Sequence, residues 1–456
     1  MNKEMKENLI KKSKIPAKNA LRMHPFYHGK IQIMPKCQIR SHQDFGIWYS
    51  PGVAAVSKEI AADKNKIFKY TNKWNYVAVV SDGSRVLGLG DIGPEAALPV
   101  MEGKALLFKY LGGVDAFPLS IGINECCSAE EIINFAKMIQ PTFGGINLED
   151  ISKPKCFSVL DTLRDDPELT IPVWHDDQQG TATVTLAALI NALKIVGKKK
   201  DDIKIVFNGI GAANFAISRL LNEDGFNLRK SIFVDSKGIL YKNRPDLLNP
   251  ENYKYEVAQI SNPEGIRGDL SYALEGADVL ISLSIPGPNI IKKEWLSKMA
   301  DDAIVFACAN PVPEIFPWDA KEAGARIVAT GRSDFKNQVN NSLGFPGIFR
   351  GTLDVRANTI SDEMCIAAAY ELADIVIDIE GCLIEDCIIP SMEYEDIYIR
   401  EAVAVGLKAI EQNIARINLS EDELTSIASE SIKNAKRQTE ILMKKGLIPQ
   451  FNDYYK

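Results

Sequence analysis

The chain has 456 residues, more than a single hydrophobic core usually serves, so two or three domains are expected. Hydrophobic residues make up 46% of the chain and charged residues 25%, which is ordinary for a globular protein. The 53 basic and 60 acidic residues give a net charge of −7, which argues against general binding to nucleic acid or to membrane surfaces.

Cysteine usage and the N-terminus both indicate where the protein works. Eight cysteines are scattered without the paired spacing of a zinc site, so we expect reduced thiols. The first 20 residues are lysine-rich, contain acids and lack an apolar centre, which predicts a charged leader, helical or frayed, rather than a secretory signal. We see no apolar run long enough to span a bilayer. The sequence therefore predicts a cytoplasmic protein without a membrane partner.

Strand-like and helix-like runs alternate in the first part of the chain, between residues 30 and 170. Segments 77–82 and 114–121 are predicted as strands, with a helix over 97–113 between them. Residues 180–200 have the apolar spacing of a helix and a basic end, which suits the carboxyl end of a helix.

Two pairs of adjacent acids stand out within this part of the chain. Glu149-Asp150 closes the stretch GGINLED, and Asp176-Asp177 lies in HDDQQGTA. Adjacent carboxylates repel each other and lose hydration near a core, so such pairs need a cation or another partner. Carboxylate oxygens are the ligands that Mg²⁺ and Mn²⁺ prefer. The acids therefore predict a divalent-metal site.

A second series of runs follows, in which short apolar strands alternate with helices. The predicted strands are 203–208, 231–235, 278–284, 303–310 and 326–330. Continuously apolar strands separated by helices indicate a parallel sheet that is buried on both faces. From about residue 356 to 456 the periodicity is mostly helical.

Two glycine-rich turns compete for the role of a dinucleotide site. The literal GxGxxG match covers 88–93, but it follows a polar segment and no clear strand–turn–helix unit surrounds it. The imperfect turn at 209–214 follows a buried strand and opens a helix, where glycines let a pyrophosphate approach a helix N-terminus. We therefore predict that the second turn binds the dinucleotide, through Gly209, Gly211, Ala212, Ala213 and Asn214.

The next predicted strand ends in Asp235, the usual place for an acid that accepts hydrogen bonds from the adenosine ribose. Asp235 would repel a 2′-phosphate and so favours NAD. Ser236 and Lys237 follow directly and could bind that phosphate, so the choice between NAD and NADP stays open.

The predicted fold class is α/β, with an N-terminal α/β catalytic domain and a Rossmann-type, doubly wound parallel-sheet domain for NAD(P). We place the first domain at residues 1–170 and the second at 171–355. Residues 356–456 are predicted to form helices that pack back on the first domain.

Six motifs, in this order along the chain, resemble those of the malic enzymes, in particular the short microbial type. They are WYSPGV (48–53), SDGSRVLGLGDIG (81–93), Gly103-Lys104, NLED (147–150), HDDQQGTA (175–182) and the NN…FPG segment (340–347). The resemblance implies oxidative decarboxylation of L-malate to pyruvate and CO₂, with a divalent metal and NAD(P)⁺. It also implies a homodimer at least.

The resemblance implies a role for each motif residue. Lys104 would be the base that takes the hydroxyl proton of malate, for which its pKa must be lowered. Tyr49 would be the acid that protonates enolpyruvate, and Arg85 would clamp a substrate carboxylate. Solvent-exposed roles for Lys104 and Arg85, and a packing role for Tyr49, are the alternatives.

The same resemblance divides the acids and adds two asparagines. It makes Glu149, Asp150 and Asp177 the metal ligands, while Asp176 would orient a ligand or Lys104. Asn310 and Asn341 would bind substrate, and Asn310 would also lie near the nicotinamide. As residues before proline or in a turn, both asparagines have a purely structural alternative.

Two other functions remain open from the residues. One is a non-redox oxaloacetate decarboxylase, for which the glycine turn at 209 would be only a remnant. The other is a sensor that binds NAD and malate without turnover, which the presence of both Tyr49 and Lys104 disfavours.

Overall fold

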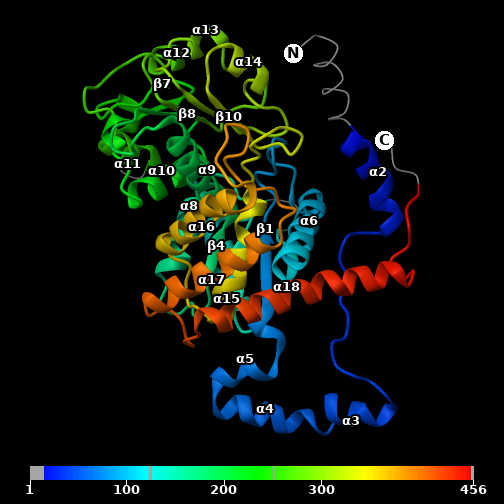
Figure 1. Ribbon diagram of the computed structural model, residues 1–456. Coiled ribbons are helices and arrows are strands. Elements are labelled where there is room, and N and C mark those ends of the chain that lie inside the picture. Colours follow the sequence, from blue (N-terminus) through cyan, green and yellow to red (C-terminus); the bar gives the residue numbers. More distant parts are fainter. Residues whose placement is uncertain (1–14, 123–125, 250–251, 453–456) are drawn as a thin grey trace.

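The computed structural model describes residues 15–122, 126–249 and 252–452 (Figure 1). Residues 1–14 of the predicted leader lie outside this range, and residues 15–20 open helix α2 (Ile15–Tyr27). Two sheets with their helices and a C-terminal group of helices form the body of the molecule (Figure 1).

The first sheet has four parallel strands in the order β2-β1-β3-β4. Helices connect the strands, as a parallel sheet requires. The strands are β1 (Tyr76–Ser81), β2 (Asp115–Ser120), β3 (Gly145–Leu148) and β4 (Val173–His175), and the helices are α6 (Pro94–Gly112), α7 (Ala129–Ile139) and α8 (Lys155–Asp165). Because β4 belongs to this sheet, the sheet continues past residue 170.

Both predicted acid pairs follow strands of the first sheet. Glu149-Asp150 follows β3, and Asp176-Asp177 follows β4 in a single π-helical turn, η4 (Asp176–Gly180). Since neighbouring parallel strands end at the same edge of a sheet, the topology brings the two acid pairs together.

The second sheet has the order β10-β9-β8-β5-β6-β7, parallel except for the short β7. Its strands are β5 (Ile205–Asn208), β6 (Ile232–Asp235), β7 (Gly238–Ile239), β8 (Val279–Ser282), β9 (Ile304–Ala307) and β10 (Ile327–Thr330). Its helices include α10 (Ala212–Glu223), α11 (Tyr253–Ile260), α12 (Leu270–Ala273), α13 (Lys293–Leu296) and α14 (Pro317–Glu322). The predicted strands are all present and the doubly wound class is confirmed, with the chain changing direction between β5 and β8. Ligands bind at such a switch point.

Helix α9 (Thr181–Val196) leads from the first sheet to the second and is buried over most of its length. By length and composition alone, residues 176–196 could cross a membrane, a match that the sequence reading had not found. Within this fold, 72% of the apolar window is buried, which makes α9 a core helix. Gly197, with φ +69°, ends the helix in the left-handed conformation that glycine adopts easily.

The C-terminal helices return to the first part of the molecule, as predicted. They are α15 (Phe345–Asp354), α16 (Asp362–Glu380), α17 (Asp396–Glu411) and α18 (Glu421–Lys444). Helix α16 packs on α9, α17 on α15 and α16, and α18 on α6. Phe108 of α6 contacts the rings of Phe345 and Phe349, at centroid distances of 4.6 and 5.1 Å. These rings hold α6 against α15.

Residues 31–62, here called the N-terminal arm, include no buried residue. The arm contains α3 (Phe45–Trp48) and α4 (Val53–Ala62). Figure 1 shows both helices extending away from the two sheets. Several of its large apolar side chains are exposed, including Ile33 (80%), Ile47 (62%) and Tyr49 (77%). The arm therefore has no core of its own.

Candidate active site

A cavity of about 1000 Å³ lies between the carboxyl edges of the two sheets. Most of the predicted site residues line it: Arg85, Lys104, Glu149, Asp150, Asp177, Gly209, Gly211, Ala212, Ala213, Asp235, Ser236, Asn310 and Asn341. Four predicted residues do not line it, namely Tyr49, Asp176, Asn214 and Lys237. The cavity thus combines the acids of the first sheet with the glycine turn of the second.

Lys104 lies on α6 at the wall of this cavity, and only 8% of its surface is exposed. Its ammonium group donates to Asp176 and lies 3.1 Å from Glu149 Oε1. The ring of Phe345 lies beneath it, with its centroid 4.2 Å away. Lys104 is therefore a buried, rigidly held amine between two carboxylates.

The predicted lowering of the Lys104 pKa is wrong for this arrangement of charges. Burial lowers the pKa of Lys104, but the carboxylates of Asp176 and Glu149 raise it by more than burial lowers it. The pKa of Lys104 therefore lies above its usual value. A divalent cation among the acids would oppose that effect of the carboxylates on the amine.

Asp176 holds Lys104 in place and does not reach the cavity. It is fully buried and accepts hydrogen bonds from Lys104, from Asn341 and, at 3.2 Å, from Trp174 Nε1. A side chain at Gly180 would collide with the Asp176 carboxylate, so the glycine of HDDQQG leaves room for it. This geometry supports the expectation that Asp176 orients Lys104.

Glu149 and Asp150 are almost completely buried, at 5% and 4% exposure. Burial raises the pKa of Glu149 well above its usual range, although Lys104 opposes this. Burial, followed by the Asp177 carboxylate, raises the pKa of Asp150 to about 8. Asp150 has φ +53°, and its backbone N–H donates to Asp177 Oδ2 at 2.9 Å. This hydrogen bond holds the Asp177 carboxylate against the backbone of Asp150.

The donors fit a hard divalent cation, although they are not gathered into a finished site. Asp150 Oδ2 is buried without a hydrogen-bond partner. Among the residues that the structure describes, no three His, Cys, Asp or Glu side chains form a ready metal cluster. Carboxylates with raised pKa values and a free buried oxygen atom are what a cation would stabilise.

Arg85 and Asn310 line the cavity from two loops, and Asn341 lines it from the short 3-10 helix η7 (Asn341–Leu343). Arg85 is exposed, and its Nη1 donates to Leu87 O at 2.8 Å, which leaves other guanidinium donors toward the cavity. Gly88, in the first GxGxxG match, lies so close to Asn310 that a Cβ would be 2.6 Å from its carbonyl oxygen. The first glycine motif therefore makes a close loop contact, and its Gly88 also lines the cavity.

The second glycine turn has the geometry of a phosphate site. Gly209 has φ +85°, and a Cβ there would lie 2.7 Å from Leu283 O. Gly211 has open space on its Cβ side and precedes α10, whose first turn has no side-chain cap. Asn214 is buried and donates to the carbonyls of Asn208 and Gly209, at 3.0 and 2.7 Å. Asn214 therefore braces the turn, and the prediction that it contacts the cofactor has no support from its position.

Asp235 forms ion pairs with two side chains that were not predicted from the sequence, Arg244 and Lys254. Arg244 donates to both of its oxygens, at 2.9 and 2.7 Å, and Lys254 Nζ lies 2.5 Å from Oδ2. Although burial opposes ionisation, these donors hold the pKa of Asp235 far below its usual value. Lys254 lines the cavity, whereas Lys237 is largely exposed and pairs with Asp246. No motif marked Lys254, which is brought in by α11.

Tyr49 is the largest disagreement with the sequence expectation. It follows α3 in the N-terminal arm, with 77% of its surface exposed. Figure 1 shows α3 well separated from α6, which carries Lys104. Within one chain, then, the structure does not bring Tyr49 to the cavity.

Fold and cavity together define an α/β protein of the dinucleotide-binding type with a cluster of acids beside the nucleotide turn. Residues 28–164 match the malic enzyme N-terminal domain and residues 178–410 match the malic enzyme NAD-binding domain. The chain belongs to the malic enzyme family, which confirms the resemblance.

Individual relatives support this membership over nearly the whole chain. A bifunctional malic/malolactic enzyme of Bacillus subtilis is 49% identical over 405 residues, covering 89% of this chain and 96% of the relative. An NAD-dependent malic enzyme of Geobacillus stearothermophilus is 50% identical over 388 residues, 85% of this chain and 78% of the relative. Other relatives are NADP-dependent malic enzymes. The crystal structure of Entamoeba histolytica malic enzyme superposes with a TM-score of 0.93 at 45% identity, covering 99% and 93% of the two chains.

Proposed function

We propose that the protein catalyses the oxidative decarboxylation of L-malate to pyruvate and CO₂, with reduction of NAD⁺ or NADP⁺. The observation that carries the proposal is the buried Lys104, held between Asp176 and Glu149 in a cavity shared with the Gly209 turn. A base, an acid cluster and a dinucleotide turn are the parts that this reaction needs. Family membership supplies the substrate.

The side chains of the cavity divide the work. Lys104, when neutral, accepts the proton of the C2 hydroxyl of malate, and Asp176 keeps its amine directed at that position. Arg85 offers a paired donor to a substrate carboxylate, and Asn341, itself hydrogen-bonded to Asp176, keeps the same region ordered.

Glu149, Asp150 and Asp177 are the proposed ligands for Mg²⁺ or Mn²⁺. The orphaned Asp150 Oδ2 and the raised pKa values of Glu149 and Asp150 support this choice. When bound, the cation would polarise the C2 oxygen and offset charge as CO₂ leaves, while the nicotinamide would accept the hydride.

Tyr49 is proposed to act in the cavity of a second subunit. It is exposed on an arm that has no buried residue, and the arm carries exposed apolar side chains that need a partner surface. A homodimer in which each arm crosses to the other body would bury that surface and deliver Tyr49 as the acid that protonates enolpyruvate. We infer a homodimer or a higher oligomer on this ground.

Lys254 is proposed to set the preference between NAD and NADP. Asp235 alone would favour NAD, but Arg244 and Lys254 neutralise its charge, so repulsion of a 2′-phosphate is reduced. Lys254, together with Ser236, lines the cavity beside Asp235 and would face that phosphate. Lys254→Ala should lower kcat/KM for NADP⁺ roughly ten-fold or more while NAD⁺ is spared, because a charged hydrogen bond is lost. An equal loss with both cofactors would contradict this role.

The remaining expectations are kept as proposals. The domain limits at residues 170 and 355 are proposals, whereas the two family matches cover residues 28–164 and 178–410 and β4 belongs to the first sheet. All eight cysteines are free thiols, which supports a cytoplasmic location.

The first test is nicotinamide reduction by the purified protein with L-malate and Mn²⁺, comparing NAD⁺ with NADP⁺ and assaying pyruvate in parallel. Reduction with an equal amount of pyruvate is the expected result. Metal-dependent pyruvate formation from oxaloacetate without any reduction would instead favour the lyase. Binding of both ligands without either product would favour the sensor.

A further inference from the structure

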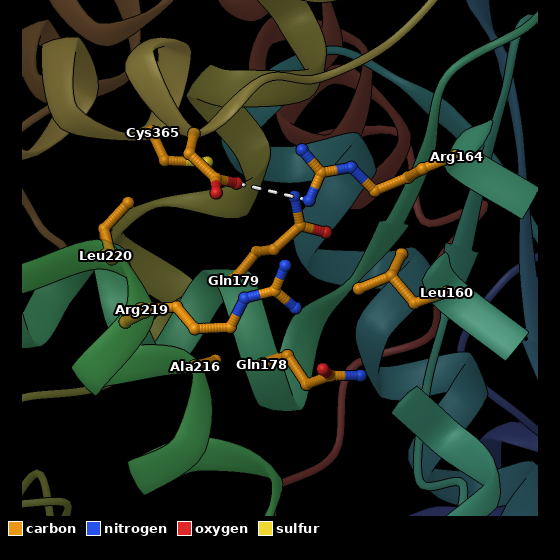
Figure 2. Close-up of a pocket in the computed structure, with 10 residues that line it drawn as sticks. Leu160, Arg164, Gln178, Gln179, Ala216, Arg219, Leu220 and Cys365 are labelled. Atoms are coloured by element: carbon orange, nitrogen blue, oxygen red, sulfur yellow. Dashed lines mark hydrogen bonds and ion pairs between the residues drawn. The ribbon is translucent and has the colours of Figure 1, made fainter. Parts of the chain in front are cut away.

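A second, smaller cavity of about 30 Å³ lies outside the active site, where helices of both sheets meet α16. Its polar lining comes from Arg164 of α8, Arg219 of α10, Asp362 of α16, and Gln178 and Gln179 of the η4 turn. Figure 2 shows the Arg164 and Arg219 guanidinium groups and the Gln179 side chain turned toward one another across this space. No step of the proposed reaction uses these groups.

The two arginines keep unused hydrogen-bond donors at the cavity. Arg164 Nη1 pairs with Asp362 Oδ1 at 3.2 Å, and Arg219 Nη1 lies 3.4 Å from Asp161 Oδ1. Each guanidinium has five N–H groups, so single contacts of this kind leave most of them available. Each guanidinium has one carboxylate partner, so the two ion pairs balance in charge, and an anion would bind through the N–H groups that these pairs leave available.

Gln179 adds a buried donor without a partner. Only 6% of the residue is exposed, and the backbone N–H of His175 donates to Oε1 at 3.0 Å, which fixes the amide orientation. The Nε2 end of Gln179 is buried and has no hydrogen-bond partner among the described residues. A buried donor of this kind requires an acceptor. The first turn of α16, which begins at Asp362, adds the positive end of a helix dipole.

We propose that this cavity binds a compact anion: the carboxylate group of a small organic acid or a small inorganic anion. The volume admits such a group but no whole metabolite. Because Gln178 and Gln179 share the η4 turn with Asp176 and Asp177, a bound anion would tie this turn to α8 and α10. It would thereby join the helices of the two sheets directly behind the active site. The proposal is independent of the reaction that the active site catalyses.

Thermal unfolding and calorimetric titration of the full-length protein test the proposal. The probes are sodium chloride, sodium acetate and sodium phosphate, at constant ionic strength maintained with a bulky sulfonate that the cavity cannot admit. Arg219→Gln removes one cation, and Ala216→Leu fills the wall of the cavity without changing charge. Arg229→Gln, at an exposed arginine in the connection between α10 and β6, is the matched control.

The expected result is saturable stabilisation by at least one anion in the wild type and in Arg229→Gln. In Arg219→Gln and in Ala216→Leu, the anion should bind roughly ten-fold more weakly or not at all, since a charged hydrogen bond or the space is lost. Stronger binding of acetate than of chloride and phosphate would identify a carboxylate as the ligand. Stronger binding of chloride or phosphate than of acetate would identify an inorganic anion. An equal response of all four proteins, meaning an adventitious ion only, or no response of the wild type, would overturn the proposal. Should Arg219→Gln fail to fold, Ala216→Leu decides the outcome.

Discussion

Two residues are proposed to transfer protons: Lys104 in the cavity wall and Tyr49 in the N-terminal arm. Their surroundings differ in burial and in contacts. Lys104 is held by Asp176, Glu149 and the ring of Phe345, and only 8% of it is exposed. Tyr49 is 77% exposed on an arm with no buried residue. One half of the proposed machinery therefore lies at the cavity of a single chain, and the other half is proposed to come from a second copy.

The largest effect is expected from Lys104→Ala, which tests Lys104 as the general base of the cavity. Malate oxidation should fall by roughly 10²–10⁴-fold, the usual contribution of a general base. Steady-state kinetics gives the loss, and fluorescence titration with the reduced dinucleotide should show binding almost unchanged. Lys109→Ala, at a partly exposed lysine on the same helix, is the control and should keep its activity. Normal turnover of Lys104→Ala would remove its assigned role.

Tyr49→Phe tests Tyr49 as the general acid. Mixed dimers of Tyr49→Phe and Lys104→Ala test whether Tyr49 acts in its own subunit or in the other one. Alone, Tyr49→Phe should lose activity by roughly 10²-fold or more because the proton donor is absent. When Tyr49→Phe and Lys104→Ala are unfolded and refolded together, mixed dimers form. If arms cross, each mixed dimer has one site with both residues intact, so about a quarter of wild-type activity should return. No recovery, with mixed dimers shown by mass spectrometry, would place Tyr49 in its own chain.

Asp177→Asn tests whether Asp177 is a ligand of the proposed metal ion. Loss of one carboxylate ligand should raise the Mn²⁺ concentration for half-maximal activity by roughly 10–100-fold. The measurement is a metal titration at saturating malate. Asp161→Asn, on the exposed face of α8, is the matched control. An unchanged Mn²⁺ titration would take Asp177 off the list of ligands.

The smallest effect concerns a buried acid, Glu401, in the C-terminal helices. Glu401 of α17 is fully buried, and neither of its carboxylate oxygens has a hydrogen-bond partner among the described residues. Burial raises the pKa of Glu401 well above its usual 4.5, so the folded state keeps a proton that the unfolded chain releases. The resulting stability is present below pH 4.5 and is lost as the pH rises toward the folded-state pKa.

Glu401→Gln should therefore be more stable than the wild type at pH 8, by roughly 1–3 kcal/mol, with a smaller gain at pH 6. Denaturant unfolding at the two pH values measures this difference. Glu411→Gln, at the exposed end of the same helix, should show no such pH dependence. A gain that is equal at both pH values would contradict the titration of Glu401.

Much of the fold could be predicted because it follows from local patterns. The apolar runs at 203–208, 231–235, 278–284, 303–310 and 326–330 all contain parallel strands, and the glycine turn at 209 lies between β5 and α10, in the predicted strand–turn–helix context. The strand order was not predictable from these runs, since pairing depends on contacts between distant segments. For the same reason β4, a three-residue strand followed directly by η4, was not recognised as part of the first sheet.

Within the site, residue identity was easier to predict than residue environment. Family motifs indicated Lys104 and the four acids, yet the sign of the Lys104 pKa shift depends on how close Asp176 and Glu149 lie. Arg244 and Lys254 were missed because neither belongs to a motif, and only the loop and helix after β6 bring them to Asp235.

The sequence by itself determined the family, the two parallel sheets and the residue types available for chemistry, because apolar periodicity and short motifs are local properties of the chain. Only the tertiary structure decided which of these residues meet. It placed Asp176 behind Lys104, replaced Lys237 by Lys254 at Asp235, and left Tyr49 outside its own cavity. The physical reason is that burial and charge pairing act through space: Lys104 and Asp176 lie 72 positions apart in the chain, and Lys254 and Asp235 lie 19 apart.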